Sequence, residues 1–182
     1  MRQMVLHPSL SRVGAFGGEL LLGKRKSARP VATRRPMHTT LRSEHAIGNR
    51  SFLMPHNSRV IRSLMKSLCS RFGIRVYEYS INSNHIHLLT LAKTRQGYKS
   101  FLRAFSGAVA MKMTGARKGT GLAKRFWAAR PWSRIVAWGK AFLVARKYVM
   151  QNHFESIGVI PYTHRGVRRQ GSHEEVPPED LA

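Results

Sequence analysis

The residues best suited to chemistry in this sequence are two histidines separated by one isoleucine, His85 and His87, in the run NHIHLL. The apolar surroundings are typical of a strand, and on a strand residues i and i+2 point to the same face. The two imidazoles could therefore hold one metal ion from one side; imidazole suits Mn, Zn, Ni or Cu, whereas Mg prefers oxygen. The alternative is a pair of ordinary strand histidines, in a chain that contains 9 histidines.

A tyrosine and an asparagine four residues apart, Tyr148 and Asn152, fall in a helical stretch and would share one of its faces. Tyrosine, with an unperturbed pKa of about 10, attacks phosphorus only if a metal polarises the phosphate and holds it in line. Such an attack leaves a 5′-phosphotyrosine and a free 3′-hydroxyl, so the strand can be rejoined without ATP. Asn152 could complete the metal shell. The alternatives are an aromatic core residue at 148 and a solvated or hydrogen-bonded amide at 152.

The charge of the chain favours a polyanionic partner. Lys and Arg total 32 against 8 Asp and Glu, which gives a formal net charge of +24, and nucleic acid is the usual partner of such a field. Between residues 36 and 170 the only acids are Glu44, Glu78 and Glu155. Two-metal nucleases need several converging carboxylates, so three scattered glutamates argue against that mechanism, whereas a histidine-based site does not need them. A ribosomal-type or histone-like binder is the alternative on charge alone.

Aromatic and guanidinium side chains alternate in the segment RFWAARPWSR, residues 125–134. Aromatic faces stack on unpaired bases and arginines bind phosphate, which is the usual chemistry of single-strand binding. The predicted nucleic-acid-binding residues are Arg125, Trp127, Arg130, Trp132 and Arg134, with Arg117, Lys118 and Lys124 from the preceding basic loop. The alternative is an edge strand whose tryptophans pack on the last helix.

Cys69 is the only cysteine, which excludes an internal disulfide and a cysteine zinc site and fits a reducing cytoplasm. No apolar run approaches membrane-spanning length. We therefore expect a cytoplasmic, nucleoid-associated protein with no membrane partner.

The composition changes at two points along the chain. Residues 1–35 mix Gly, Ser, Arg and Lys without periodicity and predict a flexible basic arm, residues 36–162 predict one folded domain, and residues 163–182 predict a disordered tail.

The expected elements alternate in a known order. They are a strand over 37–42, a helix capped by Asn57 and ending before Gly73, strands over 74–81 and 85–92, a helix carrying the apolar stripe from Tyr98 to Met113, an extended stretch over 125–137 broken at Pro131, and a helix from Gly139 to about Ser156. The first six match the β-α-β-β-α-β pattern. We expect an α+β fold: a ferredoxin-like antiparallel sheet with helices on one face, plus a C-terminal helix that carries Tyr148.

The sequence resembles the REP-associated tyrosine transposases, a branch of the single-tyrosine HUH transposases, which are similar to insertion-sequence-200-like transposases. The resemblance spans roughly residues 35–157 and is strongest in YSINSNHIHLL, residues 79–89, and in YVMQN, residues 148–152. The chain has Asn82-Ser83 where the family often has Met-Pro, and His153 where it often has Pro. The resemblance implies a divalent ion, Mg or Mn, with His85, His87 and Asn152 as ligands, and Tyr148 as the nucleophile of a catalytic helix.

The resemblance also implies a function. It is that of a metal-dependent single-stranded DNA endonuclease and strand transferase, a transposase, which forms a 5′-phosphotyrosine at or near DNA hairpins. Its partner is single-stranded or hairpin DNA, and the sequence leaves open whether the protein forms a homodimer. Two alternatives stay open: a non-catalytic DNA-binding protein of the same fold that recognises hairpin repeats, and a basic RNA-binding or ribosome-associated protein.

Overall fold

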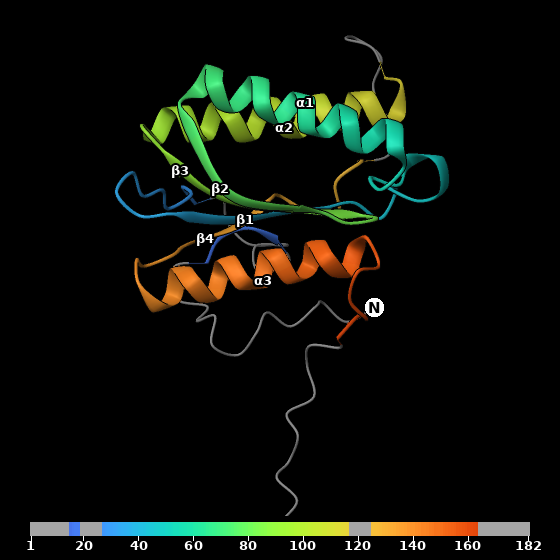
Figure 1. Ribbon diagram of the computed structural model, residues 1–182. Coiled ribbons are helices and arrows are strands. Elements are labelled where there is room, and N and C mark those ends of the chain that lie inside the picture. The colour runs from blue at the N-terminus through green and yellow to red at the C-terminus, as the bar shows by residue number, and fades with distance from the viewer. Residues whose placement is uncertain (1–14, 19–26, 117–124, 164–182) are drawn as a thin grey trace, which may run out of the picture.

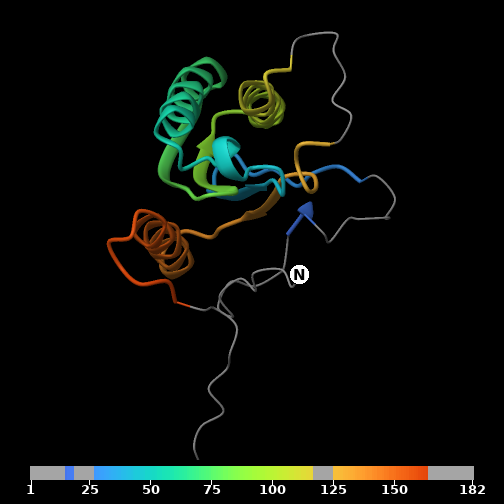
Figure 2. The ribbon, with the colours of Figure 1, turned by 90° about the vertical axis from the view of Figure 1, so that its right-hand side faces the viewer.

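A four-stranded sheet lies between two layers of helices in the computed structural model, which describes residues 15–18, 27–116 and 125–163 (Figure 1). Helices α1 and α2 cover one face of the sheet and α3 covers the other, as the side view also shows (Figure 2). The predicted DNA-binding residues Arg117, Lys118 and Lys124 lie outside the described residues, as does the predicted tail from residue 164 onward. No helix in the described part of the chain is long and apolar enough to cross a membrane.

The sheet is antiparallel with the strand order β2-β3-β1-β4. In chain order the elements are β1 (Met37–Arg42), a short 3-10 helix (Gly48–Arg50), α1 (Pro55–Phe72), β2 (Ile74–Ile81), β3 (His85–Ala92), α2 (Arg95–Thr114), β4 (Trp132–Ile135) and α3 (Lys140–Ser156). This arrangement is the ferredoxin-like one with an added C-terminal helix, and it confirms the predicted fold class. The extended stretch expected over 125–137 forms a strand only in β4.

The start of α1 differs from the prediction, which placed its cap at Asn57. The helix begins at Pro55 after Met54, because proline is pre-organised for the first turn, where its missing N–H costs nothing. The Asn57 side chain instead donates hydrogen bonds to the carbonyl oxygens of Asn49 and Ser51, each at 2.8 Å, and so ties the preceding loop to the helix. The predicted end is confirmed: Gly73 adopts a left-handed conformation with φ 65°.

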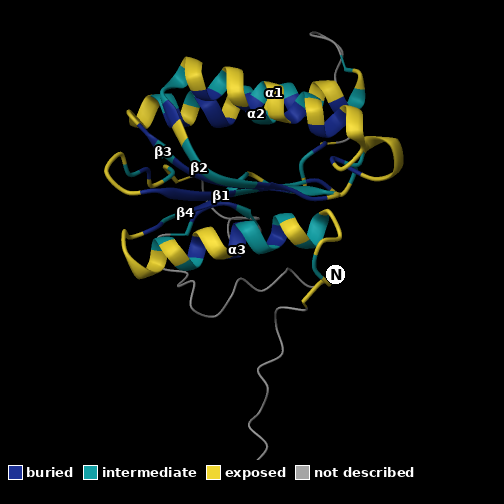
Figure 3. Ribbon diagram, viewed as in Figure 1, coloured by how far each residue is buried: buried dark blue, intermediate teal, exposed yellow. Residues whose placement is uncertain are grey.

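The alternation of side chains along β3 divides the hydrophobic residues between two cores. Ile86 and Leu88 are fully buried in the main core beneath α1 and α2, whereas Leu89 belongs to a second, smaller cluster beneath α3. Other buried members of the second cluster are Val136, Ala145, Tyr148 and Val149. Colouring by burial shows the inner sides of the helices buried against the sheet (Figure 3). Apolar burial therefore fixes α3 against the sheet face opposite the main core.

The described parts of residues 1–35 pack against the domain, so the prediction of a flexible arm is wrong for them. Phe16 forms an antiparallel bridge with Ser133 of β4, and Val31 lies in the main core. The Arg29 guanidinium donates a 2.7 Å hydrogen bond to the carbonyl oxygen of Pro131 and lies 4.7 Å from the Phe16 ring centroid. The folded unit therefore includes residues that precede Pro36.

Candidate active site

The two histidines of β3 lie side by side on the sheet face that α3 covers. Their ring centroids are 4.9 Å apart and the rings are almost perpendicular, at 85°. Leu89, the next residue on that face, packs in the cluster beneath α3. On the neighbouring strand β1, Arg42 pairs with His85 and Thr40 pairs with His87. The i, i+2 spacing in the sequence therefore becomes a pair of imidazoles on one surface.

Helix α3 brings Tyr148 to this pair. The Tyr148 ring lies 5.5 Å from the ring of His87, centroid to centroid, in an edge-to-face arrangement at 83°. The tyrosine is 6% exposed and belongs to the cluster that contains Leu89 and Val149. Packing of α3 on β2 and β3 thus places the predicted nucleophile against one of the two predicted metal ligands.

The hydrogen bonds of the two histidines suit metal binding through Nε2. Nδ1 of His85 lies 2.9 Å from Oδ1 of Asn84, and Nδ1 of His87 lies 3.0 Å from Oγ1 of Thr40. An imidazole that donates from Nδ1 to an oxygen, as His85 can to the amide oxygen of Asn84, presents Nε2 as its metal-binding atom, which is the usual arrangement at metal sites. The Thr40 hydroxyl can donate or accept, so it is compatible with the same form of His87. The two rings therefore fit a divalent ion at their Nε2 edges.

Asn152 lies one helical turn beyond Tyr148 and is 2% exposed. Its amide nitrogen donates a 2.7 Å hydrogen bond to the Tyr148 carbonyl oxygen. The amide oxygen is the atom of this side chain that can bind a metal. Within the described ranges, no three His, Cys, Asp or Glu side chains gather as a metal site. Two imidazoles completed by an amide oxygen would suit Mn better than Mg by ligand type.

His38 of β1 belongs to the same group of side chains, although the sequence did not reveal it. Its ring centroid lies 5.5 Å from that of His87 and 5.8 Å from that of Tyr148, and its Nε2 lies 3.3 Å from Nδ1 of His87. The residue is fully buried. Burial, with a smaller effect from the Arg134 charge, lowers the pKa of His38 from 6.5 to about 3, so the ring is neutral. No spacing in the sequence indicates His38, because its contact with His87 depends on the pairing of β1 with β3.

The two predicted base-stacking tryptophans contact other side chains of the protein. Trp127 is half-buried, its ring lies 5.9 Å from that of Phe52, and its indole nitrogen donates a 3.0 Å hydrogen bond to the Ser106 carbonyl oxygen. Trp132 is also half-buried and stands edge-on to the His38 ring at 5.4 Å. Trp127 therefore contacts α2 and Phe52, and not the last helix.

The three described arginines of this segment differ in exposure. Arg125 and Arg130 are exposed, so their guanidinium groups can meet phosphate. Arg134 is 5% exposed, and burial lowers its pKa. Its charge acts on His38 within the site, in contrast to the open phosphate contact that we predicted.

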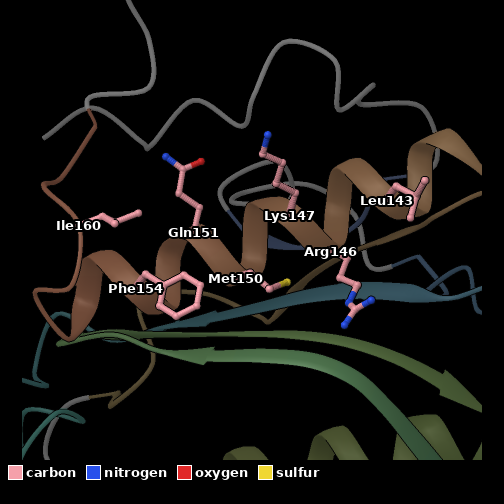
Figure 4. Close-up of a pocket in the computed structure, with 7 residues that line it drawn as sticks. All are labelled: Leu143, Arg146, Lys147, Met150, Gln151, Phe154 and Ile160. Atoms are coloured by element: carbon pink, nitrogen blue, oxygen red, sulfur yellow. The ribbon is translucent and has the colours of Figure 1, made fainter.

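The outer side of α3 carries a shallow, mostly apolar depression (Figure 4). It is lined by Leu143, Arg146, Lys147, Met150, Gln151, Phe154 and Ile160. Lys147 and Gln151 point away from the sheet, whereas Arg146 reaches the sheet edge and forms a 3.5 Å ion pair with Glu78 of β2. Gln151 therefore faces away from the histidines, although it immediately precedes Asn152.

The chain is an α+β protein with a ferredoxin-like sheet, on which a histidine pair lies against a tyrosine carried by a helix. Comparison with known proteins shows the family to which it belongs. Residues 46–152 match the model of the IS200-like transposases, so the chain belongs to that family. The matched region contains His85, His87, Tyr148 and Asn152 and begins after His38.

A solved structure shares the fold. A REP-associated tyrosine transposase bound to a REP hairpin matches with a TM-score of 0.55 and 16% identity over 70% of this chain and 72% of that chain. A candidate transposase from Deinococcus radiodurans R1 matches with a TM-score of 0.43 and 13% identity over 71% of this chain and 98% of that chain. The search of curated proteins found no match.

Proposed function

We propose that this protein is a metal-dependent single-stranded DNA endonuclease and strand transferase that uses Tyr148 as its nucleophile. The observation that carries the proposal is the edge-to-face contact between Tyr148 and His87, 5.5 Å between centroids, which joins residues from different elements. Membership of the IS200-like transposase family supports DNA as the substrate. The fold-level likeness to a REP-associated transposase bound to a hairpin supports an action at or near DNA hairpins. The protein would act on DNA in the cytoplasm, at the nucleoid.

The proposed step conserves atoms and charge. The Tyr148 oxygen bonds to phosphorus, the bond from phosphorus to the 3′ oxygen breaks, the phenol gives up its proton and the 3′ oxygen takes one up. The 5′ phosphate stays on the tyrosine, and a 3′-hydroxyl can later reverse the step without ATP. His85 and His87 would hold a divalent ion through Nε2, and Asn152 through its amide oxygen. Such an ion, when bound, polarises the scissile phosphate.

Affinity for DNA would come mainly from cations away from the tyrosine. Arg125 and Arg130 are exposed, and we propose the undescribed Arg117, Lys118 and Lys124 as further contacts. Neither α1 nor α2 contains an acidic residue, so the surface of that layer also attracts phosphate. Trp132 and Arg134 would act on the site through His38, which Trp132 contacts edge-on and on which the Arg134 charge acts. Trp127 packs against Phe52 and α2, away from the histidines.

The test is to incubate the protein and Mn²⁺ with single-stranded oligonucleotides that contain a hairpin, and to seek a covalent adduct on a denaturing gel. The His85→Ala and His87→Ala variants should bind the same oligonucleotide almost normally but form no adduct, because affinity depends on many phosphates and the metal acts on one. Cleavage by the double variant at the wild-type rate would end the metal hypothesis. Tight hairpin binding by the wild type without any adduct would identify a non-catalytic DNA-binding protein.

A further inference from the structure

Two side chains of β1 approach the same nitrogen of His87. Oγ1 of Thr40 lies 3.0 Å from Nδ1 of His87, and Nε2 of His38 lies 3.3 Å from it. Thr40 pairs directly with His87 across the two strands, and His38 pairs with Leu89, one step further along the same face. His38 is therefore held beside His87 by strand register and not by a loop.

The position of one proton decides whether His87 can bind a metal. A neutral imidazole has a single N–H, so a ring that binds metal through Nε2 carries its proton on Nδ1 and needs an acceptor there. If His38 donated from Nε2 instead, His87 would carry its own proton on Nε2 and could not be a ligand at that atom. The Thr40 hydroxyl can donate or accept, so it satisfies either form of His87 and selects neither.

We propose that His38 is a positioning residue of the active site: its bare Nε2 accepts a hydrogen bond from Nδ1–H of His87 and so directs Nε2 of His87 towards the metal. The inference rests on the proposed function, because it takes His87 as a metal ligand. It goes further by assigning a role to a residue outside the region that matches the family model.

The same side chain also contacts the nucleophile. The His38 ring stands edge-to-face with Tyr148 at 69° and is fully buried. A single residue of β1 therefore touches both the metal ligand and the attacking tyrosine. Trp132 of β4 also stands edge-on to His38, at 5.4 Å and 82°, and this contact limits the movement of the ring. A rigid support of this kind is what a metal ligand requires in order to keep its orientation.

The first measurement is the proton position in the metal-free wild-type protein, by nitrogen-15 NMR of the imidazole groups. We expect His87 to carry its proton on Nδ1 and His38 to be bare at Nε2. A proton on Nε2 of His87 would overturn the proposal, and this result does not depend on whether the protein cleaves DNA.

The second measurement is Mn²⁺ affinity without DNA, from the free-ion EPR signal. His38→Phe keeps a ring of similar size but removes the acceptor, and should weaken Mn²⁺ binding about 10- to 100-fold, the usual effect of losing an outer hydrogen-bond partner of a ligand. His38→Gln places an amide oxygen close to the former Nε2 position and should restore most of the affinity. Thr40→Val is the matched control and should weaken binding less than His38→Phe.

The outcomes separate this inference from the proposed function. Equal Mn²⁺ affinity in the wild type and in a folded His38→Phe variant would overturn the role of His38 and leave the nuclease proposal intact. An absence of Mn²⁺ binding and of adduct in the wild type would end the nuclease proposal, while the NMR result still decides the hydrogen-bond direction. If His38→Phe does not fold, the failure of His38→Gln to bind Mn²⁺ would count against the proposal.

Discussion

Replacing Tyr148 with phenylalanine removes one oxygen atom from the centre of the site and leaves its packing in place. The ring is 6% exposed and packs in the cluster beneath α3 that also contains Leu89 and Val149. Its edge-to-face contacts with His38 and His87 involve the ring, which phenylalanine retains. The variant should therefore fold, bind DNA and form no covalent adduct, because no oxygen is present to bond to phosphorus.

The structure sets the expected size of the effects on stability. Tyr148→Phe loses at most a typical net hydrogen bond, about 0.5–1.5 kcal/mol, and keeps the aromatic contacts, which contribute about 0.5–1.5 kcal/mol per pair. Tyr148→Ala also empties a buried ring site, for which about 3–5 kcal/mol is usual. Thermal unfolding of the two variants should thus separate loss of the hydroxyl from loss of packing.

Tyr77→Phe is a matched control for this experiment. Tyr77 also packs beneath α3, where its ring neighbours are Trp138 and Phe142, with centroids 5.6 Å and 5.3 Å away. This variant should form the adduct at the wild-type rate. The adduct would be trimmed with a nuclease and mapped by peptide mass spectrometry. A nucleotide on any tyrosine other than Tyr148, or an adduct in Tyr148→Phe, would refute the assignment of the nucleophile.

Three further predictions concern binding, packing and ionisation. Affinity for single-stranded DNA should fall with salt with a log-log slope of about −4 for roughly six neutralised phosphates; a flat slope would show that the charge of the chain does not face DNA. Trp127→Leu should lower the melting temperature and leave DNA affinity almost unchanged, because the indole donates a hydrogen bond to the Ser106 carbonyl oxygen. An unchanged melting temperature with a clear loss of DNA affinity would instead support base stacking. Burial raises the pKa of Cys69 from 9.0 to about 11. The unfolded chain therefore ionises first, and the free energy of unfolding should decrease from pH 9 to pH 11 more in the wild type than in Cys69→Ala.

Local patterns were sufficient to predict three of the strands in the sheet. Strands β1, β2 and β3 have the predicted bounds, since alternation, β-branched residues and turn chemistry at 82–84 are all short-range signals. The strand order followed from the β-α-β-β-α-β pattern, because crossover connections allow few topologies. The i, i+2 spacing of the histidines likewise required only that β3 be a strand.

The rest of the site depends on contacts between distant parts of the chain. His38 meets His87 only through the pairing of β1 with β3, and no spacing in the sequence indicates that register. Trp127 is a residue type that often stacks on bases. Its contacts in the structure are with Phe52 and α2, which are distant from it in the sequence. The burial of Arg134 could not be predicted from the sequence either. A short strand does not show which of its faces another segment of the chain will cover.

The register of β3 decides whether the chain has a site at all. A shift of one residue would exchange the two faces of the strand. Ile86 and Leu88 would then lie beneath α3, and His85 and His87 would enter the main core, where imidazoles without hydrogen-bond partners are costly to bury. The chemistry of the protein therefore requires a turn that fixes this register.

The turn before β3 is fixed through its main chain. The amide of Asn82 donates to the carbonyl oxygen of His85 at 2.9 Å and closes the hairpin. From outside the hairpin, the Ser43 amide donates to the Asn84 carbonyl oxygen at 2.9 Å, and the Phe52 amide donates to the Ser83 carbonyl oxygen at 2.8 Å. These bonds use backbone atoms of the turn. The chain can therefore carry Asn82-Ser83 where related proteins often have Met-Pro, and still hold both histidines on the face that meets Tyr148.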